Sequence, residues 1–397
     1  MRTKLILILA IPMVGLAFFS VNSAVEKARL AGEMQRLEAL ADLSVKLGAL
    51  AHELQKERGM TAGYLGSQGK KFIAELPAQR RESDKRHGEM KNSLKSFDAR
   101  AYGSTLSGLL DEAGRSLEGL PAKRDAASAL NIAGGEAIDY YTRTIASLLA
   151  VPRQASMLSD DKNAARLATA YANLLQAKER AGVERAVLTN VFSADRFTPE
   201  MVAKYLANAS AMSVYLHEFS ASATDEQSQF YARTMSGQYV EEVARMKKIA
   251  EEKLGESGLS VDQGRWFEMA TGKINLLKEV EERLARDLTT AAEGLRSSAR
   301  AQMIAFIALT LAAVLATAAL AYVMILKILK QLGGEPAYAA EIANEIAAGD
   351  LTVSVDTRPG DTTSLLYAMK TMSEKLREIL TQVSAGATHV ASAAQQM

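Results

Sequence analysis

The chain of 397 residues is 48% hydrophobic and 23% charged with a formal net charge of +1, a balance that excludes an intrinsically disordered protein and gives no argument for a nucleic-acid partner. It contains no cysteine, which excludes disulfides and thiolate metal sites. Seven prolines and 6% aromatic residues favour helices over sheet, so we expect an all-α fold.

The N-terminal segment has a long run without charge. Residues 5–25 are uncharged and follow Arg2 and Lys4. At about 1.5 Å per residue, the run can cross a hydrocarbon core of about 30 Å. We therefore predict that residues 1–25 hold a cytoplasmic N-terminus and a first transmembrane helix. A cleaved signal peptide is the alternative, but residues 22–24 form a poor cleavage site and the helical pattern continues past them.

A long amphipathic helix is predicted next, because leucines alternate steps of three and four at Leu40, Leu43, Leu47, Leu50 and Leu54. Its end, residues 52–59, looks like a solvent-exposed charge run. At about 100° per residue, however, Arg58 lies about five turns beyond Leu40 and points the same way. Arg58 is therefore expected within or beside the apolar face.

A second helix carries an arginine in the same kind of position. Its apolar stripe consists of Leu167, Tyr171, Leu174, Ala181, Leu188 and Phe192. Arg185 shares the direction of Leu167, whereas Arg180 is turned to the far face by roughly 140°. Glycine and proline breaks, and the capping signal Thr198-Pro199-Glu200, divide residues 26–300 into about seven or eight helices. One bundle, or two stacked bundles sharing a long helix, would accommodate them.

A buried arginine keeps its charge and needs an anion beside it. One interpretation is a structural ion pair with a nearby carboxylate, from Glu53, Glu57 or Glu184. The other is that Arg58 and Arg185 converge on a small planar oxyanion such as nitrate, nitrite or a carboxylate, which suits two guanidinium forks. Small residues would let the helices approach and carboxylates would orient the arginines; these supporting residues are Glu57, Gly59, Gly182 and Glu184.

The segment 52–66, HELQKERGMTAGYLG, resembles the first motif of the nitrate- and nitrite-sensing (NIT) domain family. Gln79-Arg80 with Ser83-Asp84 resembles its next patch, although Ser83 stands where threonine is expected. Residues 178–186 followed by Val191-Phe192 resemble a later one. The resemblance covers most of residues 40–255. It implies an all-helical periplasmic domain that binds nitrate or nitrite between paired arginines on different helices, with Arg58 and Arg185 in those roles.

The helix that leads out of this domain runs into a second uncharged segment, 301–326, flanked by Arg300, Lys327 and Lys330. We predict a second transmembrane helix there, with a buried core helix as the alternative. Because Lys and Arg beside a span favour the cytoplasm, both termini are predicted inside. Residues 26–300 would then be periplasmic, in a two-pass protein of the bacterial inner membrane.

The C-terminal segment has a short amphipathic helix, an extended connector and a second helix with a heptad seam, formed by Leu365, Met369, Met372, Leu376, Ile379 and Val383. Two such helices cannot bury their seams alone, which predicts a homodimer. Residues 327–380 resemble a HAMP relay, a parallel coiled coil. The segments 332–336, LGGEP, and 347–351, AAGDL, resemble methyl-accepting chemotaxis proteins. In such a protein residues 381–397 would be the start of the signalling helix, truncated before its hairpin. That resemblance implies a cytoplasmic histidine kinase and a coupling protein as partners.

The sequence lacks metal-ligand spacing, a phosphate-binding loop and a nucleophile elbow, so we expect no enzyme activity, cofactor or metal. The expected function is a transmembrane chemoreceptor that senses periplasmic nitrate or nitrite and signals through the relay. The first alternative is the sensor half of a histidine kinase or cyclase that recognises another small anion, such as a carboxylate. The second is a structural membrane tether without a ligand. The lipid bilayer and a second copy are expected partners, and nucleic acid is not.

Overall fold

The computed structural model describes residues 2–159 and 161–395, and no strand is formed among them. The predicted all-α class is therefore confirmed. The helices are α1 (Arg2–Gly66), α2 (Glu75–Lys95), the 3-10 helix η1 (Ala99–Tyr102), α3 (Ser104–Glu118), α4 (Leu120–Ser128), α5 (Gly134–Ala155), α6 (Lys162–Ala194), α7 (Pro199–Ser222), α8 (Asp225–Thr234), α9 (Gln238–Glu252), α10 (Gln263–Leu332), α11 (Pro336–Ala347) and α12 (Leu365–Gln395).

The chain divides into two compact units. The large unit is Ala31–Ala299, and the small unit comprises the described residues of Met1–Leu30 and Arg300–Met397. The large unit contains α2 to α9 whole, together with parts of α1 and α10. The small unit contains α11 and α12.

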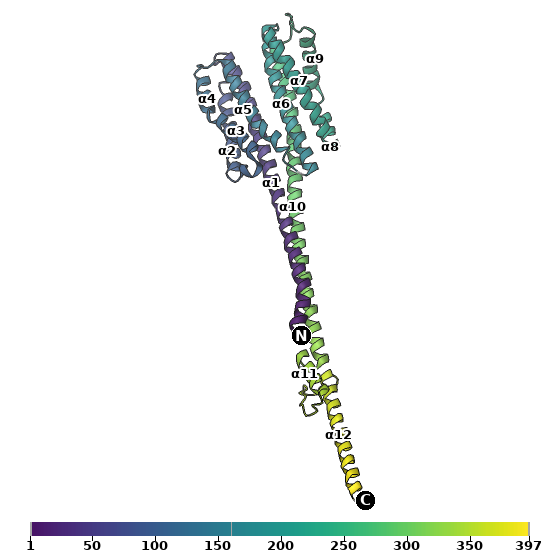
Figure 1. The fold of residues 1–397 in the computed structure, drawn as a ribbon. Helices are drawn as coiled ribbons and strands as arrows, with labels where there is room; N and C mark the ends of the chain where they lie inside the picture. Colours follow the sequence, from purple (N-terminus) through teal and green to yellow (C-terminus); the bar gives the residue numbers. More distant parts are fainter. Residues whose placement is uncertain (1, 160, 396–397) are drawn as a thin grey trace. The chain divides into compact units, whose positions relative to one another are not determined.

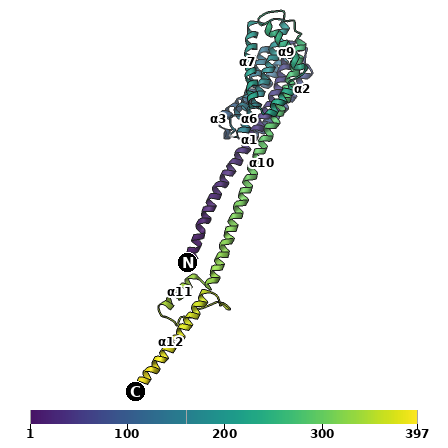
Figure 2. The same cartoon turned by 90° about the vertical axis from the view of Figure 1, so that its right-hand side faces the viewer.

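The large unit consists of two groups of helices that share α6 and α10. Helices α2 to α5 gather around the end of α1, and α7 to α9 lie beside α6 and α10 (Figures 1 and 2). One apolar core joins α1, α3, α5, α6 and α10 with contributions from α2, α4 and α7, and a second joins α6, α7, α9 and α10. Because α6 enters both cores, its side chains contact α1 on one side and α10 on another.

Local sequence accounts for the helices that matter here. The five leucines of α1 from Leu40 to Leu54 are at most 2% exposed, so the predicted apolar face is present. Asp161 caps the start of α6, where its carboxylate accepts a hydrogen bond from the backbone N–H of Ala164, and the C-terminal cap Asp195 adopts a left-handed conformation. Helix α7 starts at the predicted cap, with the Thr198 hydroxyl accepting from the N–H of Met201 and Pro199 in the first position.

One helical segment of the described residues, Gln263–Ala347, is long and apolar enough to cross a membrane by length and composition. It contains the predicted second span. The first predicted span lies in α1, which is helical without a break from Arg2 to Gly66. The side chains of residues 1–14, 16 and 17 lie outside the described part of the structure.

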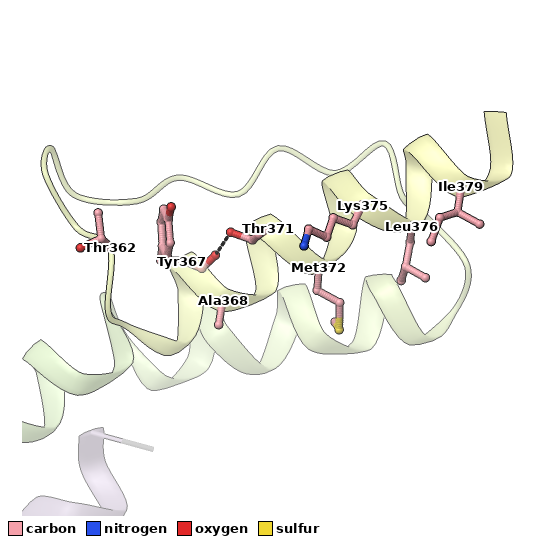
Figure 3. A pocket seen from close by; sticks show the side chains of 8 residues that line it. All are labelled: Thr362, Tyr367, Ala368, Thr371, Met372, Lys375, Leu376 and Ile379. Atoms are coloured by element: carbon pink, nitrogen blue, oxygen red, sulfur yellow. Dashed lines mark hydrogen bonds between the residues drawn. The ribbon is translucent and has the colours of Figure 1, made fainter. Parts of the chain in front are cut away.

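The small unit has its own apolar core between α11, the connector and α12, formed by Ala339, Ile342, Val355, Leu366 and Met369. Gly333 lies at φ +80°, and a Cβ there would collide with the Ser364 side chain, so glycine is required at this close approach. Further along α12 the heptad seam is uncovered, with Met372 45% and Ile379 54% exposed. Figure 3 shows this flank of α12, where Met372, Leu376 and Ile379 line an open groove.

Candidate functional site

Arg58 lies near the end of α1 and is 5% exposed. Its guanidinium forms a bidentate ion pair with the carboxylate of Glu179 on α6, in which Nη1 donates to Oε1 at 2.6 Å and Nη2 donates to Oε2 at 3.1 Å. Nη1 also donates to Thr142 Oγ1 of α5 at 3.0 Å. Gln55, one turn earlier on α1, donates to Glu179 Oε2 at 2.8 Å. The predicted inward position of Arg58 is confirmed, but its partner is none of the glutamates suggested by the sequence.

Arg185 lies on α6 and reaches α10. Its Nη1 donates to Thr271 Oγ1 at 2.8 Å, and its guanidinium carbon lies 4.7 Å from the centre of the Phe267 ring, a cation–π distance. Its backbone carbonyl accepts from Trp266 Nε1 at 3.0 Å, which holds this turn of α6 against α10. Within the described part of the chain, no carboxylate oxygen lies within 4.0 Å of its guanidinium nitrogens. Arg185 therefore has aromatic and hydroxyl partners where Arg58 has a carboxylate.

Two glycines let the two arginines approach. A Cβ built on Gly59 would lie 3.1 Å from Arg185 Nη2, and one built on Gly182 would lie 3.1 Å from Arg58 Nη2. Burial, and after it the charge of Arg58, lowers the pKa of Arg185 to about 10, and Glu179 partly offsets this effect. The structure thus gathers both arginines and both glycines in one place, while their role in binding stays a prediction.

Glu57 is adjacent to Arg58 in sequence but belongs to a different contact. It is fully buried and accepts from Arg124 Nε at 2.7 Å, Arg124 Nη2 at 2.8 Å and the Tyr141 hydroxyl at 2.6 Å. Arg124 also donates to Asp84 at 2.6 Å. One residue corresponds to about 100° of rotation, so Glu57 faces α4 and α5. Its ion pair with Arg124 and its hydrogen bond with Tyr141 hold α1 against α4 and α5.

The other two carboxylates named by the sequence also have partners of their own. Lys247 Nζ of α9 lies 2.6 Å from Glu184 Oε2, and Glu184 is buried. Glu53 accepts from Gln79 Nε2 at 2.7 Å and from Lys56 Nζ at 2.9 Å. Neither carboxylate forms the arginine ion pair that the sequence suggested.

A second set of buried charges lies next to the arginines and joins α1, α6 and α10. Lys178 donates to one oxygen of Glu281, whose other oxygen accepts from Lys278 at 2.8 Å. Burial lowers the pKa of Lys178, and Glu281 partly offsets the change. His52 Nδ1 lies 3.4 Å from Lys178 Nζ. Burial, with a further contribution from Lys178, lowers the pKa of His52 and keeps its ring uncharged near neutral pH.

The sequence interpretation missed Glu179, which makes the main contact of Arg58. At about 100° per residue Glu179 points about 120° away from Leu167, outside the predicted stripe, so the helical pattern did not indicate this contact. The contributions of Thr142, Thr271 and Gln55 had no signal either, since threonine and glutamine are common in helices.

Comparisons with known proteins bear on this site. A family model described as "Nitrate and nitrite sensing" matches residues 49–289. The nitrate regulatory protein of Klebsiella oxytoca is 29% identical over 268 residues, 66% of this chain and 66% of that protein. The chain thus spans about two thirds of the length of this relative. The structure of the NasR transcription antiterminator matches with a TM-score of 0.63 and 24% identity, over 92% of this chain and 99% of that one, which shows a shared fold.

These findings contradict the expected receptor and its location. The similar proteins are a nitrate regulatory protein and a transcription antiterminator, so the predicted two-pass, inner-membrane chemoreceptor with a periplasmic sensor, a histidine kinase and a coupling protein is wrong. The physical reason is that a long uncharged run does not by itself identify a membrane span. Residues 301–326 are uncharged and apolar, but both lipid and protein can cover such a surface.

The expectation that nucleic acid is not a partner is contradicted as well, because the matching structure is of a transcription antiterminator. A net charge of +1 is an average over 397 residues, so it cannot exclude a nucleic-acid partner. By their names both similar proteins are regulators, which agrees with the expected lack of enzyme activity.

Proposed function

Because the chain belongs to the nitrate- and nitrite-sensing (NIT) family, we propose that it is a regulatory protein that binds nitrate or nitrite between Arg58 and Arg185. The family match, 49–289, contains both arginines. The observation that carries the residue assignment is the approach of two guanidinium groups across Gly59 and Gly182, with Glu179 as their shared counter-charge.

The charge and shape of this group suit nitrate and nitrite. Each of these ions carries a single negative charge spread over coplanar oxygens, which match the planar donor edge of a guanidinium. Glu179 acts on Arg185 without a direct contact, so an anion beside Arg185 would add negative charge at its guanidinium. The hydroxyls of Thr142 and Thr271 already contact the two arginines and can assist.

The proposed mechanism is a change in how α1, α6 and α10 pack. Arg58 projects from α1, while Arg185 projects from α6 toward α10. An anion bound by both would favour the arrangement in which the guanidinium groups are closest. A regulator needs two arrangements that differ by a few kcal/mol, so that an anion with a modest preference for one of them shifts the balance.

Calorimetry and thermal unfolding of the purified full chain test this proposal. Nitrate or nitrite should raise the unfolding midpoint and release or absorb heat, whereas chloride should do neither at the same concentration. Arg58→Lys should lose most of the binding, since an ammonium group cannot hold both oxygens of Glu179 in a planar fork and still present N–H donors to the anion. Arg180→Lys, on the far face of α6, is the matched control. A wild-type chain that binds neither nitrate nor nitrite would contradict the proposal.

We further propose that residues 26–300 are the sensor domain, that residues 327–380 are a HAMP-type relay, and that residues 381–397, whose described part continues α12, are the start of a signalling helix. A homodimer in which α12 pairs with its copy is part of this proposal. The support is the small unit's own core together with the uncovered seam that continues it, in which Met372, Leu376 and Ile379 are 45%, 39% and 54% exposed. Exposed heptad positions of this kind are typical of a coiled coil.

Cross-linking tests the dimer directly, because the chain has no cysteine of its own. Ile379→Cys on the seam should form a disulfide-linked dimer rapidly under mild oxidation. Glu378→Cys, one position off the seam, should react slowly. Equal rates for the two variants would contradict the paired α12 helices.

A further inference from the structure

Glu179 lies beside both arginines of the proposed anion site, and its role inferred below rests on that proposed function. Its carboxylate is 2% exposed and takes both prongs of Arg58, while Gln55 holds one of its oxygens at 2.8 Å. Its charge also acts on Arg185, since it partly offsets the lowering of the Arg185 pKa. One carboxylate thus serves two arginines.

The balance of these charges leaves an excess of one positive charge. Arg58 and Arg185 contribute two positive charges and Glu179 contributes one negative charge. An uncompensated charge away from water is costly, so a buried site favours the ligand whose charge brings the total to zero. For this set of three side chains, that ligand is a monovalent anion.

The neighbouring charges do not alter the count at the arginines. Lys178 is 1% exposed and is compensated by direct contact with Glu281, and Lys278 shares the same carboxylate while 21% of its side chain reaches solvent. His52 carries no charge near neutral pH, because burial lowers its pKa. The charge count at the proposed anion site therefore reduces to Arg58, Arg185 and Glu179.

We infer that Glu179 is the residue that selects monovalent over divalent anions, by neutralising Arg58 and setting the charge of the site to a single positive unit. Nitrate and nitrite are then accepted, and sulfate is refused because it would leave a buried negative charge. Sulfate is also more strongly hydrated in water than nitrate, and the charge of Glu179 adds to the preference for nitrate that this hydration produces. The role of Glu179 is distinct from that of the arginines, which attract any anion.

Glu179→Gln in the full chain isolates this effect, since glutamine keeps the size of the side chain and removes its charge. Binding of nitrate and of sulfate is measured by calorimetry for both proteins at equal ionic strength. We expect the variant to bind nitrate about tenfold more tightly, and sulfate to gain by a larger factor, because the Coulomb energy grows in proportion to the charge of the ligand. The hydration of each anion is the same in both measurements and cancels in the ratio.

Glu281→Gln is the matched control. Glu281 is also 2% exposed, and its loss makes the same change of charge in the same buried layer, but it contacts lysines. The ratio of sulfate to nitrate affinity should change much less in this variant than in Glu179→Gln. An equal change in both variants would mean that the total charge of the buried residues, and not Glu179 in particular, sets the sulfate-to-nitrate ratio, and this would overturn the role of Glu179.

Other outcomes are equally decisive. A wild-type chain that binds sulfate as tightly as nitrate overturns the inference without any variant, so a Glu179→Gln protein that fails to fold does not prevent the test. A folded Glu179→Gln protein with an unchanged sulfate-to-nitrate ratio, or with no measurable sulfate binding, also overturns it. In these cases wild-type nitrate binding still stands, and the proposed function survives. Only the absence of nitrate and nitrite binding to the wild type removes both.

Discussion

The surroundings of Arg58 and Arg185 differ in the way each buried positive charge is compensated. Arg58 has a carboxylate on both prongs, at 2.6 and 3.1 Å, and a threonine hydroxyl. Arg185 has a threonine hydroxyl and the face of Phe267, and its pKa is lowered to about 10, first by burial and then by Arg58. Two arginines with the same position in a helical sequence pattern can therefore have different partners. We expect Arg58 to contribute to the stability of the unliganded fold, and Arg185 to contribute mainly to the proposed binding of nitrate.

The largest expected effect is that of Arg58→Ala. Its loss leaves Glu179 as a buried carboxylate without its cation, which should lower the free energy of unfolding by about 3–5 kcal/mol. Nitrate binding should fall below detection in the same protein. Urea unfolding and calorimetry measure the two effects. If Arg58→Ala is as stable as the wild type, the ion pair with Glu179 does not have the structural role described here.

Arg185→Ala should separate binding from stability. The affinity for nitrate should fall by about 2 kcal/mol or more, as for the loss of one member of a buried charge contact. The free energy of unfolding should change by no more than about 1 kcal/mol, because a cation–π contact is lost while the repulsion from Arg58 is relieved. Arg180→Ala is the control and should leave the affinity unchanged. Equal losses of affinity in Arg180→Ala and Arg185→Ala would refute the assignment by helix face.

The two glycines provide a smaller and reciprocal test. Gly59→Ala should displace the guanidinium of Arg185, and Gly182→Ala that of Arg58, because each new methyl group would lie 3.1 Å from the nitrogen concerned. We expect each change to weaken nitrate binding by about 1 kcal/mol, comparable to the loss of one hydrogen bond. Gly88→Ala in α2, where the added methyl group meets open space, should raise helix stability and leave binding unchanged. Calorimetry on the three variants decides whether the two glycines act through the arginines.

The dependence on pH should be the smallest effect near neutrality. The pKa of His52 is lowered by burial, so no imidazole charge appears beside the site at about pH 6.5, where an exposed histidine titrates. Nitrate affinity should therefore be flat across that range. Above the Arg185 pKa of about 10 the arginine begins to lose its proton in the folded protein, and affinity should fall. The sign for stability is opposite, because the unfolded chain holds this proton to a higher pH, so the stability due to Arg185 rises as pH passes above its folded pKa. A titration of nitrate affinity with a clear step near pH 6.5 would contradict the neutral state of His52.

Much of the helical architecture was readable from the sequence. The leucines of α1 and the cap at Thr198 depend on spacing and on contacts within a few residues, and both were predicted correctly. The inward position of Arg58 was readable for the same reason, because the direction of a side chain on a helix depends on residue number alone. The resemblance of residues 52–66 to the sensing family is likewise a local property, and the family match over 49–289 agrees with it.

The pairing of the buried charges was decided by the tertiary structure. Glu57 and Glu179 are both buried carboxylates near arginines in the sequence, yet Glu57 binds Arg124 of α4 while Glu179 binds Arg58, 121 residues away. Which helix faces which is set by the packing of apolar faces over the whole unit, and a linear pattern has no information about the partner across an interface. For the same reason the sequence could show that residues 301–326 are uncharged and apolar without showing what they contact. The sequence alone determined which side chains point inward, and the packing of α1, α6 and α10 determined which of them meet.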